Sequence, residues 1–259
     1  MGSKVESRNF GVFDVKITKA RVGRNPSHPL SELKESTLQF TCKIIASDHF
    51  QTMNLPEKIQ KLVRDATFKI HLKSGASGQC VLVDNSFIIT AAHCVEWKFP
   101  WIALRPEHHL SDIKTPHDDF KAMTFAVEPV SDIAVLGSPL PQIHYFENED
   151  FDRICEPIIP LQLMQKIPAD LEEFPVWIWT HHNTWVKGVA RYSQRAIFGC
   201  AIFSYTTDFP IEAGTSGGPI VNREGELVGV VSNGTTDCAA GFLPLALPAW
   251  ILKEIARTN

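Results

Sequence analysis

Hydrophobic and polar positions alternate in short runs along most of the chain, which is the pattern of β-strands with one buried face. From residue 67 onward these runs are TFKIHLKS, GQCVLV, FIITAAHC, MTFAVEPV, DIAVLGS, VWIWT, VKGVARYS, CAIFSYTT, GPIVN and LVGVVSNG. Turn-forming Gly, Pro and Asn residues separate them, and no helical segments alternate with them. The pattern therefore predicts an all-β sandwich or barrel.

The two ends of the chain show other patterns. Residues 11–20 and 37–46 read as strands separated by the turn-rich sequence GRNPSHPL, so residues 1–54 are predicted to form a hairpin-like N-terminal extension. Apolar residues recur with helical spacing in LPEKIQKLVRDAT, which predicts a short amphipathic helix at the start of the domain 55–259. The sequence PAWILKEIAR predicts a terminal helix over about 248–257.

The composition is that of an ordinary globular protein, with 44% hydrophobic and 21% charged residues among 259. A net charge of -4 without a Lys/Arg run argues against a nucleic-acid partner. The sequence contains no apolar run of membrane-spanning length, and its first residues lack the features of a secretory signal. We therefore expect a cytoplasmic protein that does not bind membranes.

Six cysteines are spread along the chain, and none of them forms a CxxC pair. They are too sparse for a scaffold that depends on disulfides, so we expect reduced, buried thiols. One or two bridges are the alternative, and Cys80 with Cys94 is the pair best placed locally.

Three short segments supply the residue types that a serine nucleophile needs for peptide hydrolysis. His93 ends a strand in FIITAAHC, Asp132 precedes a strand in SDIAVL, and Ser216 lies in the Gly-flanked turn GTSGGPIV. We interpret Ser216 as the nucleophile, His93 as its base and Asp132 as the acid that orients the base. The N–H groups of Gly214 and Ser216 would form the oxyanion hole.

Each segment alone has an ordinary structural explanation, as a core histidine, a turn aspartate or a glycine-rich loop. The order of the three segments, each backed by a strand, favours the catalytic interpretation. Asp118 and Asp119 are the alternatives to Asp132, but neither precedes a buried strand.

Together the segments resemble the chymotrypsin-like serine peptidases, whose signatures are a TAAHC box, a D-I-A-L/V-L segment and a G-x-S-G-G-P box. The resemblance covers residues 65–257 and implies two six-stranded antiparallel β-barrels, the first over about 65–150 and the second over about 165–247. The active site would lie between the barrels, with His93 and Asp132 on the first and Ser216 on the second. No metal or organic cofactor is implied.

Within this group the chain resembles the HtrA/Deg and other bacterial-type trypsin-like peptidases. Thr215 stands where zymogen-derived enzymes have an Asp that pairs with a newly cut N-terminus, so that activation switch is absent. LALP at 245–248 is similar to the F-A-I-P segment of the HtrA group. We expect no C-terminal PDZ module.

VVSNGTT resembles the edge strand along which these enzymes pair the substrate backbone. Ser232, Asn233 and Gly234 are therefore predicted substrate-binding residues, with an ordinary Asn-Gly turn as the alternative. Asn233-Gly234-Thr235 fits a glycosylation sequon, which we discount because a glycan would block the cleft.

The segment before the nucleophile is predicted to line the pocket for the residue that precedes the scissile bond. Pro210, Ile211 and Ala213 would form this pocket, and Glu212 would point to its rim or to solvent. A Lys or Arg side chain needs a buried carboxylate, which the pocket base lacks. We therefore expect cleavage after small or medium apolar residues.

The pairs His108-His109 and His181-His182 invite a metal interpretation. Adjacent residues of a strand point to opposite faces, so we expect surface loops and no metal site. Trp177, Trp179 and Trp185 are interpreted as core aromatics.

Two further functions are compatible with the sequence. One is a pseudoprotease that acts as a scaffold, although the intact triad argues against it. The other is a protease that a regulatory partner activates, with the N-terminal extension as the contact. In the leading interpretation the partner is a protein or peptide substrate, and the sequence leaves the oligomeric state open.

Overall fold

The computed structural model describes residues 4–7, 10–14, 54–72, 75–84, 86–96, 109–192, 202–232, 237–247 and 252–253. The chain divides into two units, Met1–Asn54 and Leu55–Asn259. In the first unit, β1 (Lys4–Ser7) and β2 (Phe10–Asp14) pair as an antiparallel hairpin. Residues 37–46, the other strand expected in this extension, lie outside the described residues.

The first six strands of the second unit form a closed barrel in the order β3-β4-β5-β8-β7-β6, in which every neighbouring pair is antiparallel. The strands are β3 (Thr67–His71), β4 (Ser77–Asp84), β5 (Phe87–Ala91), β6 (Leu110–Lys114), β7 (Asp119–Glu128) and β8 (Ile133–Gly137). Every residue of β5 and β8 is buried, so both read as continuous apolar runs instead of alternating ones.

The other six strands form an antiparallel sheet in the order β13-β12-β9-β10-β11-β14. They are β9 (Glu173–Trp179), β10 (Trp185–Tyr192), β11 (Ile202–Thr207), β12 (Pro219–Val221), β13 (Leu227–Val230) and β14 (Asp237–Gly241). The two edge strands, β13 and β14, also contact each other, so this second barrel is nearly closed. Its core contains Ile178, Phe203, Tyr205, Ile220 and Phe242.

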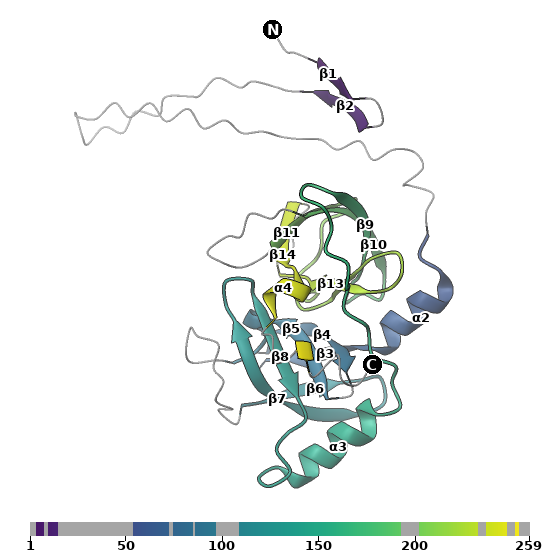
Figure 1. The fold of residues 1–259 in the computed structure, drawn as a ribbon. Coiled ribbons are helices and arrows are strands. Elements are labelled where there is room, and N and C mark those ends of the chain that lie inside the picture. The colour runs from purple at the N-terminus through teal and green to yellow at the C-terminus, as the bar shows by residue number, and fades with distance from the viewer. Residues whose placement is uncertain are drawn as a thin grey trace, which may run out of the picture. The chain divides into compact units, whose positions relative to one another are not determined.

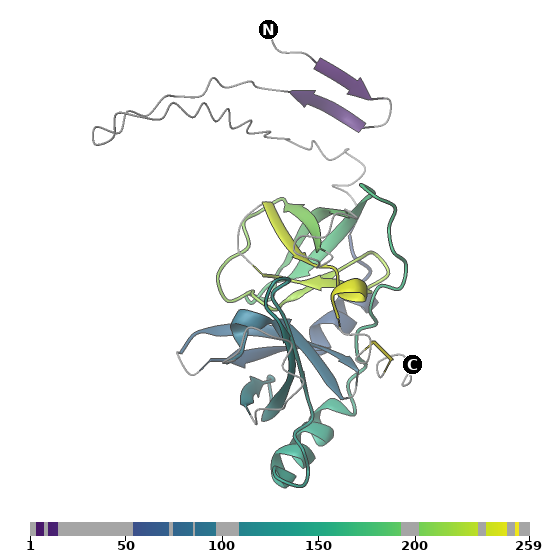
Figure 2. The ribbon, with the colours of Figure 1, turned by 60° about the vertical axis from the view of Figure 1, so that its left-hand side comes forward.

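Figures 1 and 2 show the two barrels as adjacent lobes of the second unit. The expectation of an all-β chain with two six-stranded antiparallel barrels is therefore confirmed. The amphipathic helix expected before the first barrel is α2 (Glu57–Asp65). It also reaches the second barrel, because a Cβ on Gly225 would lie 2.6 Å from Ile59 and the Arg64 guanidinium lies 6.0 Å from the Trp179 ring centroid.

Two further helices were not predicted from the sequence. Helix α3 (Tyr145–Cys155) packs on β7, with the rings of Phe151 and Phe120 edge to face at 5.6 Å. Helix α4 (Leu243–Ala246) follows β14. Of the terminal helix expected over 248–257, only residues 252–253 are described, and they are helical. None of the described helices has the length and apolar character to cross a membrane.

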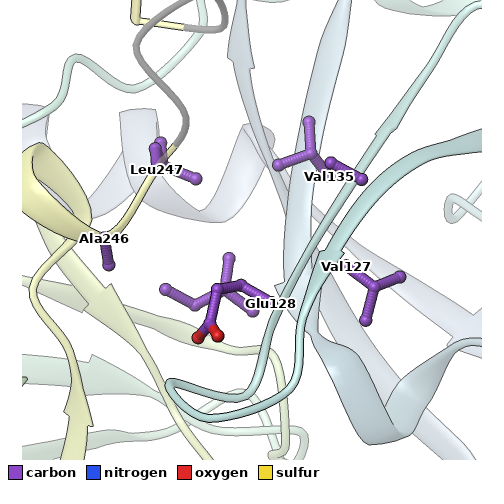
Figure 3. A pocket seen from close by; sticks show the side chains of 7 residues that line it. Val127, Glu128, Val135, Ala246 and Leu247 are labelled. Atoms are coloured by element: carbon purple, nitrogen blue, oxygen red, sulfur yellow. The ribbon is translucent and has the colours of Figure 1, made fainter. Parts of the chain in front are cut away.

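A small pocket lies where α4 meets β7 and β8 of the first barrel (Figure 3). Val127, Val135, Ala246 and Leu247 contribute apolar side chains to it, and Glu128 is its only charged lining residue. The pocket lies beside the turn that joins β7 to β8.

The four described cysteines, Cys80, Cys94, Cys155 and Cys238, are buried, and none of them forms a disulfide. This agrees with the expected reduced thiols, and the alternative bridge between Cys80 and Cys94 is not formed. Burial, with smaller contributions from Cys155 and Cys94, raises the pKa of the Cys80 thiol well above its ordinary value. The thiol of Cys80 is therefore neutral and behaves as a small apolar group.

Candidate active site

His93 lies in a short 3-10 turn, Ala92–Cys94, which begins directly after β5. Because every residue of β5 is buried, the strand fixes the point at which the chain leaves the barrel. The N–H of Ala92 donates to the backbone oxygen of Asp132 at 3.0 Å, which ties this turn to the start of β8. The His93 side chain is 48% exposed, so a substrate can reach it.

Asp132 holds His93 through both of its carboxylate oxygens. Oδ2 lies 2.7 Å from Nδ1 of the imidazole, and Oδ1 accepts the backbone N–H of His93 at 3.0 Å. Asp132 adopts a left-handed backbone conformation with φ 54°, which Asp tolerates better than most residues. With Nδ1–H donating to Asp132, the neutral imidazole keeps its lone pair on Nε2, the nitrogen a general base uses.

Two more side chains support Asp132, and sequence reasoning assigned neither of them this role. Ser232 donates its hydroxyl to Oδ2 of Asp132 at 2.6 Å. Glu128 accepts the backbone N–H of Val130 at 3.2 Å, and it also accepts the N–H and the hydroxyl of Ser131. The turn that carries Asp132 is therefore fixed by the carboxylate seen in Figure 3.

The charge state of His93 follows from these contacts. The hydrogen bond to Asp132, followed by the interaction with Cys94, raises the pKa of His93 above its ordinary value of 6.5, and partial burial opposes the shift. A carboxylate next to an imidazole stabilises the imidazolium form. The same interaction would stabilise the cation that forms when the imidazole accepts a proton.

Ser216 lies in the turn before β12, and its backbone is held against the first barrel. Its carbonyl accepts the N–H of Gln79 at 2.7 Å and lies 3.7 Å from the thiol of Cys94, the residue after His93. Gly217 has φ 80° and donates its N–H to Val231 at 2.7 Å. A Cβ on Gly217 would lie 2.0 Å from the oxygen of Gln79, so this position requires glycine.

The turn over residues 212–215 leaves two amides available next to the Ser216 hydroxyl. The N–H of Thr215 donates to Glu212 at 3.2 Å, and Gly214 has φ 94°, a combination typical of a type II turn. Within the described part of the chain, the N–H groups of Gly214 and Ser216 donate to no other residue. These are the two amides predicted to form the oxyanion hole.

The contact between the proposed nucleophile, Ser216, and the proposed base, His93, is less direct than the contact between His93 and Asp132. Among the described residues no hydrogen bond joins the Ser216 hydroxyl to His93, although the thiol of Cys94, the next residue after His93, lies 3.7 Å from the Ser216 carbonyl oxygen. Such hydrogen bonds are often long without substrate and tighten in the complex. The alternative acids lie elsewhere on the surface, where Asp118 pairs with Arg153 at 3.6 Å and Asp119 with Lys114 at 3.5 Å.

The predicted substrate-binding residues fall in different environments. Pro210 and Ala213 are exposed, whereas Ile211 is 2% exposed and packs in the core of the second barrel. Asn233 and Gly234 lie outside the described residues. Glu212 is exposed, as expected, and points toward the turn between β9 and β10.

The expectation that His181 and His182 lie in a surface loop is confirmed, but the argument that adjacent side chains point to opposite faces holds only for a strand and does not apply to them. The two residues lie in the turn between β9 and β10 instead of in a strand, and Asn183 in this turn has φ 59°. Their ring centroids are 3.7 Å apart. His181 Nδ1 lies 3.0 Å from the Thr215 hydroxyl and His182 Nε2 lies 2.7 Å from the Glu212 carboxylate.

Comparison with known proteins places this geometry in a family. Residues 76–230 match the family model described as a trypsin-like peptidase domain. The mitochondrial serine protease HTRA2 of Bos taurus is 28% identical over 190 residues, which are 70% of this chain and 35% of that protein. The chain thus spans about a third of the length of this relative.

One solved structure with a TM-score above 0.5 shows the same fold at low sequence identity. The active form of the Rv3671c protease from M. tuberculosis has a TM-score of 0.51 and 14% identity, over 94% of this chain and 95% of that one. The serine endoprotease from Yersinia pestis has a TM-score of 0.49 and 16% identity, over 79% of this chain and 68% of that one. The family match spans the segments that hold His93, Asp132 and Ser216, and the chain belongs to the trypsin-like peptidase domain family.

Proposed function

We propose that the chain is a serine endopeptidase that cleaves protein or peptide substrates with Ser216, His93 and Asp132. Family membership supports peptide hydrolysis by a serine nucleophile. The observation that carries the residue assignment is the pair of hydrogen bonds from His93 to Asp132, at 2.7 Å and 3.0 Å. These bonds orient the imidazole from the ring side and from the backbone side at once.

In the proposed reaction the Ser216 oxygen bonds to the scissile carbonyl carbon while its proton moves to Nε2 of His93. The carbonyl oxygen becomes an oxyanion, and the amides of Gly214 and Ser216 stabilise it. His93 then gives the proton to the leaving amine as the C–N bond breaks, which leaves an acyl-enzyme on Ser216. Water, deprotonated by His93, attacks the acyl carbon, and the serine regains its proton as the acid product leaves.

The preferred substrate residue before the scissile bond is proposed to be small or medium-sized and apolar. Glu212 is the acid nearest to the nucleophile in sequence, and it is 68% exposed and engaged with His182. A carboxylate in that position does not offer the buried partner that a Lys or Arg side chain requires. Ile211 fills the core of the second barrel, which leaves the exposed Pro210 and Ala213 as the candidate contacts.

Labelling with a fluorophosphonate probe tests the proposal, because this reagent forms a stable adduct only with an activated serine. We expect wild-type protein to be labelled and Ser216→Ala to remain unlabelled. Ser204→Ala is the matched control, since it removes an exposed hydroxyl from β11 and should be labelled like the wild type. If folded wild-type protein is not labelled, the proposed competent site is refuted and the scaffold alternative is favoured.

A further inference from the structure

Two turns that are distant in sequence meet beside the nucleophile and bring three potential metal ligands together. One is the turn between β9 and β10 with His181 and His182, and the other is the 212–215 turn with Glu212. One ligand atom from each of these side chains lies within 4.8 Å of the other two. We propose that His181, His182 and Glu212 form a binding site for a divalent transition-metal ion, with Zn²⁺ as the representative ion.

The donor set has the chemistry of an open zinc site. Two imidazole nitrogens and one carboxylate are typical protein ligands of Zn²⁺ in a site that keeps a fourth position for water. Tetrahedral bonds of about 2.0–2.1 Å separate ligand atoms by about 3.3 Å. The 2.7 Å between His182 and Glu212 must therefore lengthen, and any separation closer to the 4.8 Å limit must shorten. His182 and Glu212 can move to do so, because their side chains are 57% and 68% exposed.

His181 is held in an orientation that suits a ligand. Its Nδ1 lies 3.0 Å from the hydroxyl of Thr215, a buried residue. When Nδ1–H donates to that oxygen, the neutral ring keeps its lone pair on Nε2 for a metal. A hydrogen bond from the other ring nitrogen is the usual support of a metal-binding histidine. The ring also packs on Gly214, where an added Cβ would lie 3.3 Å from it.

Without a metal ion, His182 and Glu212 contact each other directly. Nε2 of His182 and the Glu212 carboxylate are 2.7 Å apart, so the proton of one hydrogen bond lies between them. An ion that replaces this proton would connect the β9–β10 turn to Glu212, whose carbonyl accepts the N–H of Thr215. The site would thereby fasten the turn that carries the oxyanion amides.

Zinc affinity, measured by competition with a chromophoric chelator on the native chain, tests the site without relying on peptidase activity. We expect one Zn²⁺ to bind wild-type protein, and His182→Ala and Glu212→Gln each to weaken binding by at least about tenfold. Thr215→Val should weaken it by about 10- to 100-fold through loss of the support for His181, and Thr215→Ser should restore it.

Two control variants separate this site from other zinc-binding groups. His117→Ala removes an exposed histidine from the turn between β6 and β7, and His93→Ala removes the imidazole beside Asp132. Both should bind one Zn²⁺ with wild-type affinity. Unchanged affinity in His182→Ala and Glu212→Gln, loss of binding in His93→Ala, or no binding by the wild type would overturn the proposal. The fluorophosphonate result bears on the proposed peptidase function alone, so the two can fail separately.

Discussion

Asp132 contacts His93 at both ends of the residue, through Nδ1 of the ring at 2.7 Å and through the backbone N–H at 3.0 Å. One carboxylate thus fixes the tautomer of the imidazole and the path of the chain that carries it. Because the carboxylate itself accepts the hydroxyl of Ser232, its own rotation is limited. The predictions about activity follow from this arrangement.

Asp132→Asn should lower kcat by about 10⁴-fold, because an amide can donate to Nδ1 and so favour the tautomer that lacks a basic Nε2. The substitution is nearly isosteric, so the fold should persist. Steady-state kinetics with a cleavable peptide measure the effect, and Asp119→Asn, at an exposed ion pair, is the control with expected wild-type activity. Full activity in Asp132→Asn would refute the assignment of this residue.

The pH dependence of kcat/KM should report the titration of His93. The reaction needs the neutral imidazole, and Asp132 raises the pKa of His93 above 6.5. Activity should therefore be low in acid and rise through a midpoint above 6.5, and the residual activity of Asp132→Asn should rise at a lower pH than that of the wild type. A wild-type midpoint well below 6.5 would contradict the carboxylate–imidazole interaction.

Ser232→Ala should reduce kcat moderately, by about three- to tenfold, and leave the protein folded. The variant removes one neutral donor from a carboxylate that keeps its contacts with His93, and such a hydrogen bond contributes about 0.5–1.5 kcal/mol. Ser232→Thr keeps the hydroxyl and should retain more activity than the alanine variant. Equal activity of wild type and Ser232→Ala would show that the bond does not orient Asp132.

Gly217→Ala should abolish activity, and it should destabilise the protein more than an alanine substitution at a positive-φ glycine that has open space around it. Its Cβ would lie 2.0 Å from the Gln79 oxygen, so the nucleophile turn must move away from the first barrel. Gly75→Ala is the matched control, because Gly75 has φ 85° but no atom within 4 Å of the added Cβ. Backbone strain alone costs about 1–2 kcal/mol. Thermal unfolding should show the larger loss in Gly217→Ala, and similar losses in both would contradict the clash.

The sequence predicted the parts of this molecule that depend on local patterns. FIITAAHC contains the buried β5 and the turn that presents His93, and SDIAVL contains Asp132 and the buried β8. His93 follows a buried strand and Asp132 precedes one, so the position of each residue in the fold could be inferred from the apolar runs in the sequence. The runs predicted an all-β sandwich or barrel, and the two six-stranded barrels were implied by the resemblance to the chymotrypsin-like serine peptidases.

Contacts between segments distant in sequence could not be read in the same way. The histidine pair follows the apolar run of β9, and nothing in its own sequence indicates that the β9–β10 turn folds onto Thr215 and Glu212. Ser232 was assigned to the substrate, whereas its hydroxyl contacts Asp132, 100 residues earlier. Helix α3 was not predicted because acidic residues interrupt the helical spacing of its apolar residues. Its apolar side becomes evident only in the structure, where the helix packs on β7.

The last prediction concerns the substrate residue before the scissile bond. A peptide library should show dominant cleavage after Val, Ala, Leu or Ile, because the described pocket segment presents Pro210 and Ala213 and no buried carboxylate. Glu212→Gln should leave this preference unchanged, since the Glu212 side chain is 68% exposed and engaged with His182.

Two other cleavage profiles would each contradict this interpretation in a distinct way. Dominant cleavage after Lys or Arg that Glu212→Gln removes would show that the carboxylate leaves His182 and turns into the pocket. Dominant cleavage after Glu would point to His181, whose ring packs on Gly214 beside the nucleophile. Burial, followed by the neighbouring His182, lowers the pKa of His181. A neutral His181 at pH 7 has no charge with which to attract an acidic side chain, so the apolar preference is the expected result.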